Sequence, residues 1–140
     1  MSKRDTDVIK MLLQVGSKEF RSHSFWIEVF AEFLATLLFL FMACGTVLPW
    51  NDTPPSAIHI AFSHGLSIAT LAMAFQHVSG GQMNPAVTIA MMFVGRVTVL
   101  KAGFFIGAQC IGGRLHAYVP FKSIIKLLLS RIKQITNIFF

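Results

Sequence analysis

The sequence predicts an all-α membrane protein, and three observations lead to this fold class. First, 54% of the 140 residues are hydrophobic and 13% are charged, whereas a soluble domain carries about 25% charged residues. Second, apolar runs reach the roughly 20 residues that a helix needs to cross the hydrocarbon core. Third, HVSGGQMNPAVT (77–88), with two glycines and a proline, interrupts the apolar sequence. Together they predict three transmembrane helices and one re-entrant half-helix.

Residues 1–24 predict a cytoplasmic N-terminal tail. They are polar and of mixed charge, unlike the apolar core of a cleavable signal peptide. Basic residues precede the first apolar run and are absent from the loop 49–57, which places the N-terminus in the cytoplasm by the positive-inside rule. The net charge of +6 is therefore interpreted as a topology signal. It does not indicate nucleic-acid binding, because the aromatic residues lie in charge-free runs.

The first apolar run, residues 26–48, contains two carboxylates. Glu28 and Glu32 are four residues apart and therefore share one helix face. A charged side chain in the hydrocarbon region is costly and normally faces a bundle interior or water. Glu28 is expected either near the interface or inside the bundle. Glu32 lies deeper and is expected to have an internal partner.

Two further apolar runs are rich in small residues, which let helices approach closely in membranes. The second run, residues 58–75, contains His64, which we expect to be a packed, hydrogen-bonded group rather than a proton relay. The third run, residues 97–113, contains Gly103 and Gly107 in a GxxxG pair. That pair predicts a helix-packing face.

The stretch 77–88 has the residues of a loop followed by a helix start. Non-helical backbone is tolerated at membrane depth only where it lines a wet cavity or is covered by protein, so Gly80 and Gly81 indicate carbonyls turned toward a polar space. Asn84 fits a helix N-cap and Pro85 the first helical position. The apolar segment that follows is too short to span, which favours a half-helix with a partly positive N-terminus. The simpler alternative is a helix that begins after a surface turn.

These motifs closely resemble the first half of the aquaporin or major intrinsic protein family. The motifs that carry the resemblance are AEFLATLLF (31–39), GLSIATLA (65–72), HVSGGQMNPAVT (77–88) and GAQCIGG (107–113). The resemblance covers residues 25–113 and identifies them as a first hemichannel. It implies an aquaporin-like right-handed helical bundle, of which this chain holds one half of an inverted repeat.

The resemblance also implies roles for individual residues. Glu32 would bind and brace the re-entrant loop, and His77 would lie at the cytoplasmic vestibule. His64 occupies a selectivity-filter position where water-selective members typically have Phe, so the resemblance does not imply narrow selectivity for water. Glycerol stands as an alternative to water because the second half of the repeat, which would discriminate them, is not in this sequence. Asn84 would donate its amide to the oxygen of a permeating molecule. The residues implied to line the pore, by side chain or backbone carbonyl, are Asn84, Pro85, Ala86, Gly80, Gly81 and Gln82.

Residues 114–140 depart from the family pattern. From residue 114 onward the family's small apolar residues give way to a divergent basic amphipathic tail, and no second Asn-Pro-Ala motif or filter arginine follows. A basic amphipathic segment is typical of an interfacial helix. A splice variant, a read-through product and a gene-model artefact would each explain the change. With three spans the tail would emerge outside, against the positive-inside rule.

The sequence excludes several classes of function. It has no nucleophile–base pair, phosphate loop or zinc-ligand spacing, so the chain is not expected to be an enzyme or to hold a metal or cofactor. Cys44 and Cys110 are expected to be buried free thiols. The resemblance implies a plasma-membrane channel for passive transport of water, or of glycerol and other small neutral solutes, with lipid and other aquaporin subunits as partners. The alternative is a non-conducting truncated isoform that associates with and modulates full-length channels.

Overall fold

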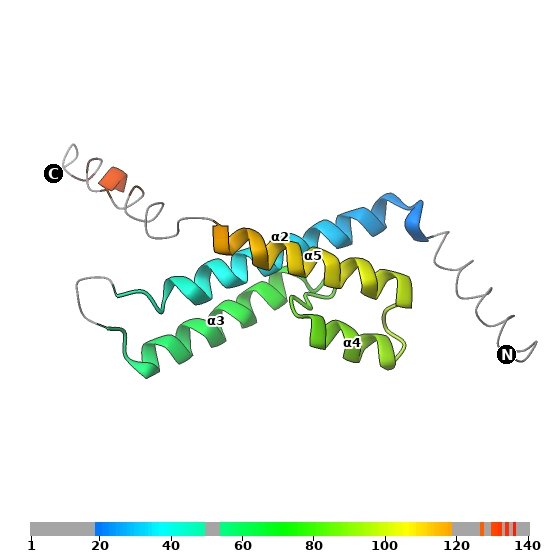
Figure 1. Cartoon of the computed structure of the whole chain (residues 1–140), viewed down its shortest axis with the longest axis horizontal. Coiled ribbons are helices and arrows are strands. Elements are labelled where there is room, and N and C mark those ends of the chain that lie inside the picture. Colours follow the sequence, from blue (N-terminus) through cyan, green and yellow to red (C-terminus); the bar gives the residue numbers. More distant parts are fainter. Residues whose placement is uncertain are drawn as a thin grey trace, which may run out of the picture.

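The structure, a computed structural model, describes residues 19–49 and 54–118 together with residues 127, 130–132, 134 and 136. Its helices are α2 (His23–Gly45), α3 (Ala57–Phe75), α4 (Pro85–Phe93) and α5 (Val99–Tyr118). The residues described contain no strand. Helix α2 packs against both α3 and α5, and the short α4 packs against α5 (Figure 1).

Helices α3, α4 and α5 begin at residues whose side chains accept from free backbone N–H groups, whereas Ser22 at the start of α2 makes no such bond. Ser56 Oγ accepts a 3.2 Å hydrogen bond from the N–H of His59 at the start of α3. Thr98 Oγ1 accepts from the N–H of Lys101, at 3.4 Å, at the start of α5. Helix α4 begins at Pro85, the position that the sequence predicts, and has nine residues. It is therefore too short to cross a bilayer.

Two of the described helices, α2 and α3, are long and apolar enough to cross a membrane. Much of α3 faces away from the rest of the chain, and its large apolar side chains are exposed at Ile58, Phe62, Leu66 and Met73. Helix α5 covers the third predicted span but is not one of the two, since Lys101, Gln109 and Arg114 lower its hydropathy. The count of three spans thus stays a prediction.

The core of the chain lies where α2, α3 and the loop before α4 meet. Ala35 on α2, Leu71 on α3 and Met83 in the loop are buried against one another. Phe39 and Phe75 are partly buried beside them. The loop side chain of Met83 therefore serves as a core residue and fixes the loop to the two helices.

The predicted packing face at Gly103 and Gly107 is wrong for the contacts within this chain. A Cβ atom built on either glycine would meet nothing within 4 Å, whereas one on Gly112 would lie 2.7 Å from the carbonyl oxygen of Phe33. The stripe by which α5 packs has a spacing of three and four residues, and its buried members are Ala102, Phe105, Ala108, Gln109 and Gly112. Because Gln109 turns this stripe toward α2, the GxxxG pair falls on another face of α5.

Cys44 and Cys110 are free, as expected, but both are exposed rather than buried. Their chain neighbours Ala43 and Gln109 are buried. Adjacent helix residues point about 100° apart, so each thiol is turned out of the helix contact that its neighbour makes.

The predicted terminal tails lie largely outside the described residues, including residues 1–18 and most of 119–140. Helix α5 continues through Arg114 to Tyr118. The helix therefore extends past residue 113, where the predicted hemichannel ends.

Candidate functional site

The centre of the candidate site is the carboxylate of Glu32, which is fully buried on α2. Its Oε1 accepts hydrogen bonds from Ser79 Oγ at 2.7 Å and from the N–H of Gln82 at 2.9 Å. Its Oε2 accepts from the N–H of Met83 at 2.7 Å and from Gln109 Nε2 at 2.8 Å. A buried carboxylate is tolerable only when such bonds replace its hydration. Glu32 thereby joins α2 to α5 and to the loop before α4.

Gln109 extends this network to α4. Its Nε2 also donates to Thr88 Oγ1 at 2.9 Å, and Thr88 in turn donates to the carbonyl oxygen of Asn84 at 3.2 Å. The side chains of Gln109 and Thr88 are almost wholly buried. One amide group thus fixes the position of the first turn of α4 relative to Glu32.

The loop before α4 needs left-handed backbone at three positions. Gly80 has φ 93°, Gly81 has φ 59° and Met83 has φ 50°. A Cβ on Gly81 would lie 2.8 Å from the carbonyl oxygen of Ala72, so the loop passes against the last turn of α3. Left-handed backbone costs a non-glycine residue about 1–2 kcal/mol. At Met83 the hydrogen bond to Glu32 and the burial of the side chain offset this cost.

Asn84 ends the loop and caps α4. Its Oδ1 accepts a 2.9 Å hydrogen bond from the N–H of Ala86, which fixes the orientation of the amide. The side chain is exposed, and no residue that the structure describes accepts a hydrogen bond from its Nδ2. Asn84 therefore presents amide donors at the partly positive end of a helix, and Pro85 adds no competing N–H.

Two predicted site residues lie apart from the Glu32 network. The Nδ1 atom of His64 on α3 lies 3.0 Å from the carbonyl oxygen of Ile60, and the His64 ring meets Phe39 edge-on at 6.5 Å. His77 is exposed just beyond the end of α3. Neither histidine makes a hydrogen bond to Glu32, Gln82 or Asn84.

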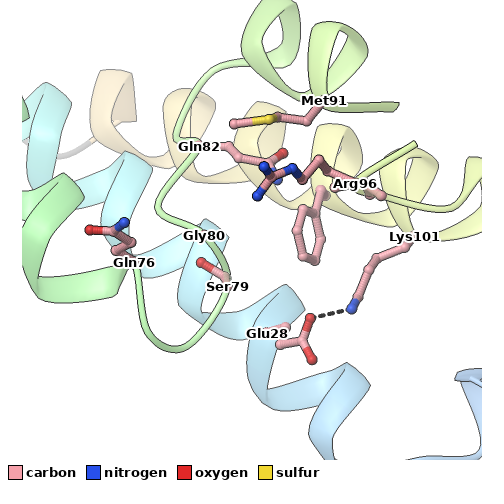
Figure 2. A pocket seen from close by; sticks show the side chains of 10 residues that line it. Glu28, Gln76, Ser79, Gly80, Gln82, Met91, Arg96 and Lys101 are labelled. Carbon is pink, nitrogen blue, oxygen red and sulfur yellow. Dashed lines mark ion pairs between the residues drawn. The ribbon is translucent and has the colours of Figure 1, made fainter. Parts of the chain in front are cut away.

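Glu28 lies one helical turn before Glu32 and has a different partner. It forms an ion pair with Lys101 at the start of α5 (Figure 2), and Ser24 Oγ donates to it at 3.2 Å. The Glu28 and Lys101 side chains are about one-fifth exposed, at 19% and 22%. The two carboxylates on one face of α2 thus have different partners. Glu32 binds the loop and the middle of α5, and Glu28 binds the start of α5.

Three polar members of the network are not singled out by the sequence, namely Ser79, Thr88 and Gln109. Each lies inside a quoted motif, yet serine, threonine and glutamine are common in apolar helices and loops. The residue that the sequence could have indicated is Gln109, whose side-chain amide lies between apolar residues of α5, because a buried amide requires hydrogen-bond partners.

Among the described residues, no three His, Cys, Asp or Glu side chains are grouped so that they could hold a metal ion.

Comparison with known proteins places this arrangement in a family. The model of the family "Major intrinsic protein" matches residues 19–136, so the match continues beyond residue 113. Aquaporin-2 from Homo sapiens is 49% identical over 107 residues, which are 73% of this chain and 40% of that protein. Aquaporin-5 from Homo sapiens is 43% identical, over 74% of this chain and 41% of that protein.

Aquaporin-4 from Mus musculus is 40% identical over 75% of this chain and 34% of its own length. The chain thus spans less than half the length of these relatives. The matched family is one of channels and not of enzymes. A family match over most of the chain, together with these identities, shows that the chain belongs to the major intrinsic protein family.

Proposed function

We propose that the chain is part of a membrane channel that passes water by diffusion, and that Asn84 lies in its pore. The observation that carries this proposal is the exposed amide of Asn84 at the N-terminus of α4, in a loop that Glu32 holds by three hydrogen bonds. Membership of a channel family and the two apolar helices of spanning length support it. The expected location is the plasma membrane, with the N-terminus in the cytoplasm.

The proposed mechanism needs no chemical step and no energy input. The Nδ2 of Asn84 donates to the oxygen of a passing molecule, because its Oδ1 is already held by Ala86. The carbonyls of Gly80, Gly81 and Gln82 accept its hydrogens in sequence. The partly positive end of α4 disfavours cations and protons. Pro85 and Ala86 form the first turn of the half-helix, which re-enters the membrane without crossing it.

Solute selectivity is assigned to His64, with glycerol as the alternative to water. The contact between His64 Nδ1 and the carbonyl of Ile60 draws the ring toward its own helix, and the edge contact with Phe39 limits its rotation. A polar ring at a constriction leaves room and hydrogen bonds for a polyol, which a Phe ring does not. His77 is proposed to lie in the cytoplasmic vestibule.

A second function is favoured by the exposed faces of the chain. Ile58, Phe62, Leu66 and Met73 on α3 are each more than 60% exposed, and Phe93 at the end of α4 is 81% exposed. Residues of α3 and α4 flank the proposed pore, so a bare surface there suits contact with other channel subunits. In this alternative the chain does not conduct and instead associates with full-length channels and modulates them.

The deciding experiment is osmotic swelling of vesicles that contain the purified chain, comparing Asn84→Asp with the native sequence. Asp caps a helix as well as Asn does, so the fold is retained while the amide donor is replaced by a carboxylate. Water permeability is expected to fall by roughly tenfold, the effect of losing one good hydrogen bond. Ser22→Asp places the same carboxylate at the N-cap of α2 and is the matched control. It is expected to leave the water permeability unchanged.

The outcomes separate the two functions. Swelling that falls in Asn84→Asp and not in Ser22→Asp supports the channel. Swelling at the rate of empty vesicles, with the chain confirmed in the membrane, rejects conduction by this chain. Co-purification with a full-length relative, together with a change in that relative's amount at the cell surface, then supports the modulating function.

A further inference from the structure

A polar cavity lies beside the loop that Glu32 holds, at the end of the bundle where α2 and α5 begin. Its volume is about 360 Å³, and side chains of α2, the loop, α4 and α5 line it. Figure 2 shows Arg96, Gln82 and Lys101 arranged around it, with Glu28 opposite Lys101. The proposed water pathway does not use the Arg96 side chain or the Glu28–Lys101 pair.

The charges around the cavity leave one cation without a counterion. Lys101 is neutralised by its ion pair with Glu28. Arg96, which follows α4, lines the cavity, and none of the residues that the structure describes accepts a hydrogen bond from its guanidinium group. That group carries five N–H donors in a planar fork that matches the oxygens of a phosphate or carboxylate. The lining residues therefore carry one net positive charge, at Arg96, together with its free donors, while the Glu32 carboxylate lies behind the lining and is held by Ser79 and Gln82.

A buried acceptor in the same cavity narrows the chemistry of the ligand. The side-chain oxygen of Gln82 is buried and has no hydrogen-bond partner, and the residue is only 6% exposed. Leaving such an oxygen unpaired is costly, because its hydrogen bonds to water are lost and not replaced. Gln82 lines the cavity, and a turn of its amide would bring Oε1 to the cavity surface. A ligand that then satisfies both groups must offer anionic oxygens to Arg96 and one O–H to Gln82 Oε1. A singly protonated phosphate monoester has this combination, whereas a phosphate diester has no O–H on its phosphate.

The position of the cavity favours a lipid as the source of that phosphate. Four aromatic rings gather near the same end of the bundle, with centroids 5.2–5.9 Å apart: Phe20, Phe25, Trp26 and Phe104. Trp26 is exposed, and its Nε1 donates to the carbonyl of Phe20. Tryptophan is enriched where hydrocarbon meets headgroups. Basic pockets between helices at that level bind anionic headgroups.

We propose that this cavity binds a phosphate monoester, the headgroup of phosphatidic acid, with Arg96 holding the anionic oxygens and Gln82 Oε1 accepting the phosphate O–H. Free inorganic phosphate shares this chemistry and is the other source that the test must separate. Binding at this site is independent of whether the chain conducts water.

The test uses the full chain purified in a mild detergent, with bound lipid counted by native mass spectrometry during titration. The probes are phosphatidic acid, inorganic phosphate and phosphatidylmethanol, an anionic diester without a phosphate O–H. Phosphatidic acid is expected to bind saturably and more tightly than phosphatidylmethanol. Arg96→Gln is expected to weaken phosphatidic acid binding by about tenfold or more, as for a lost charge-assisted hydrogen bond.

Two further variants test whether binding depends on the position of the charge and on the Gln82 acceptor. Arg114→Gln removes the same charge from the exposed opposite end of α5 and is expected to leave binding unchanged. Gln82→Met keeps the backbone N–H that Glu32 accepts and is expected to abolish the preference for phosphatidic acid over phosphatidylmethanol. Unchanged helical circular dichroism shows that each variant is folded.

Each remaining outcome decides the proposal. Saturable binding of inorganic phosphate as tight as that of phosphatidic acid, and lost in Arg96→Gln, assigns the site to soluble phosphate. Equal losses in Arg96→Gln and Arg114→Gln would mean general charge attraction and overturn the site. Equal binding of the two lipids by the native chain overturns the role of Gln82, and no saturable binding of any probe overturns the proposal.

Discussion

The carboxylate of Glu32 on α2 accepts a 2.8 Å hydrogen bond from Gln109 on α5, a residue 77 positions later in the chain. The same carboxylate receives the N–H groups of Gln82 and Met83 from the loop. One buried anion therefore sets the spacing between two helices and the shape of the loop that leads to Asn84.

Replacing Glu32 by Gln is expected to lower the free energy of unfolding by about 3 kcal/mol. The new amide can still accept from Ser79 and Gln82, but its NH₂ group faces the donors of Met83 and Gln109. Denaturant titration of the protein in detergent micelles measures the loss. Glu28→Gln is the matched control, since its ion pair is partly exposed and such pairs contribute less than about 1 kcal/mol. Equal losses would contradict the central role of Glu32.

Gln109 and Thr88 are expected to be energetically coupled. The Gln109 amide donates to Glu32 and to Thr88, so Gln109→Leu removes both bonds at once. Thr88→Val keeps the shape of Thr88 and removes the second of these bonds, together with the bond from Thr88 to the carbonyl oxygen of Asn84. A double-mutant cycle on the free energy of unfolding should give a coupling of about 1 kcal/mol. Additive losses would show that the bond between these side chains contributes nothing.

Gly81→Ala is expected to destabilise the chain by about 2 kcal/mol or more, through two separable effects. The added Cβ would meet the carbonyl oxygen of Ala72 at 2.8 Å, and alanine at positive φ costs about 1 kcal/mol. Gly95 also has positive φ, at 73°, but open space around its Cβ position, so Gly95→Ala carries only the second cost. Thermal unfolding followed by circular dichroism compares them, and similar shifts would argue against the close approach of loop and α3.

Gly112→Ala is expected to force α2 and α5 apart, because its Cβ would lie 2.7 Å from the carbonyl oxygen of Phe33. A loss of about 1–3 kcal/mol is typical of overpacking. Gly103→Ala serves as the control on the same helix. Its Cβ meets nothing, and alanine favours a helix over glycine by about 1 kcal/mol. A chain that tolerates Gly112→Ala as well as Gly103→Ala would have a different helix contact.

The helices and the start of α4 are predictable from the sequence because they rest on local signals. Apolar runs of known length give α2 and α3, and the Asn-Pro pair gives the first turn of α4. The face by which α5 packs is not predictable in this way. A glycine pair four apart indicates that close approach is possible, but Gly112 rather than Gly103 meets α2, since the rotation of α5 is set by Gln109 and its distant partner.

The candidate site also contains some residues that local sequence identifies and others that only distant contacts identify. Glu32 and Asn84 are residue types that stand out in apolar sequence, so each is identified alone. The other members of the network, Ser79, Thr88 and Gln109, become recognisable only in the folded chain. Ser79 and Gln109 bond to Glu32 from 47 and 77 residues away along the sequence. The left-handed backbone of Met83 is equally hidden, because methionine carries no local preference for it.

Because the ribosome makes the chain in order, Gln109 is synthesised some time after Glu32. A ribosome adds about 5–20 residues per second, so about 4–15 seconds separate the synthesis of the carboxylate from that of its last partner. During that interval α2 exists with an incompletely bonded carboxylate in an apolar segment, which is costly in lipid. Helix α2 therefore needs wet or protein-lined surroundings until α5 has been made, and its insertion is completed only when α5 supplies that partner.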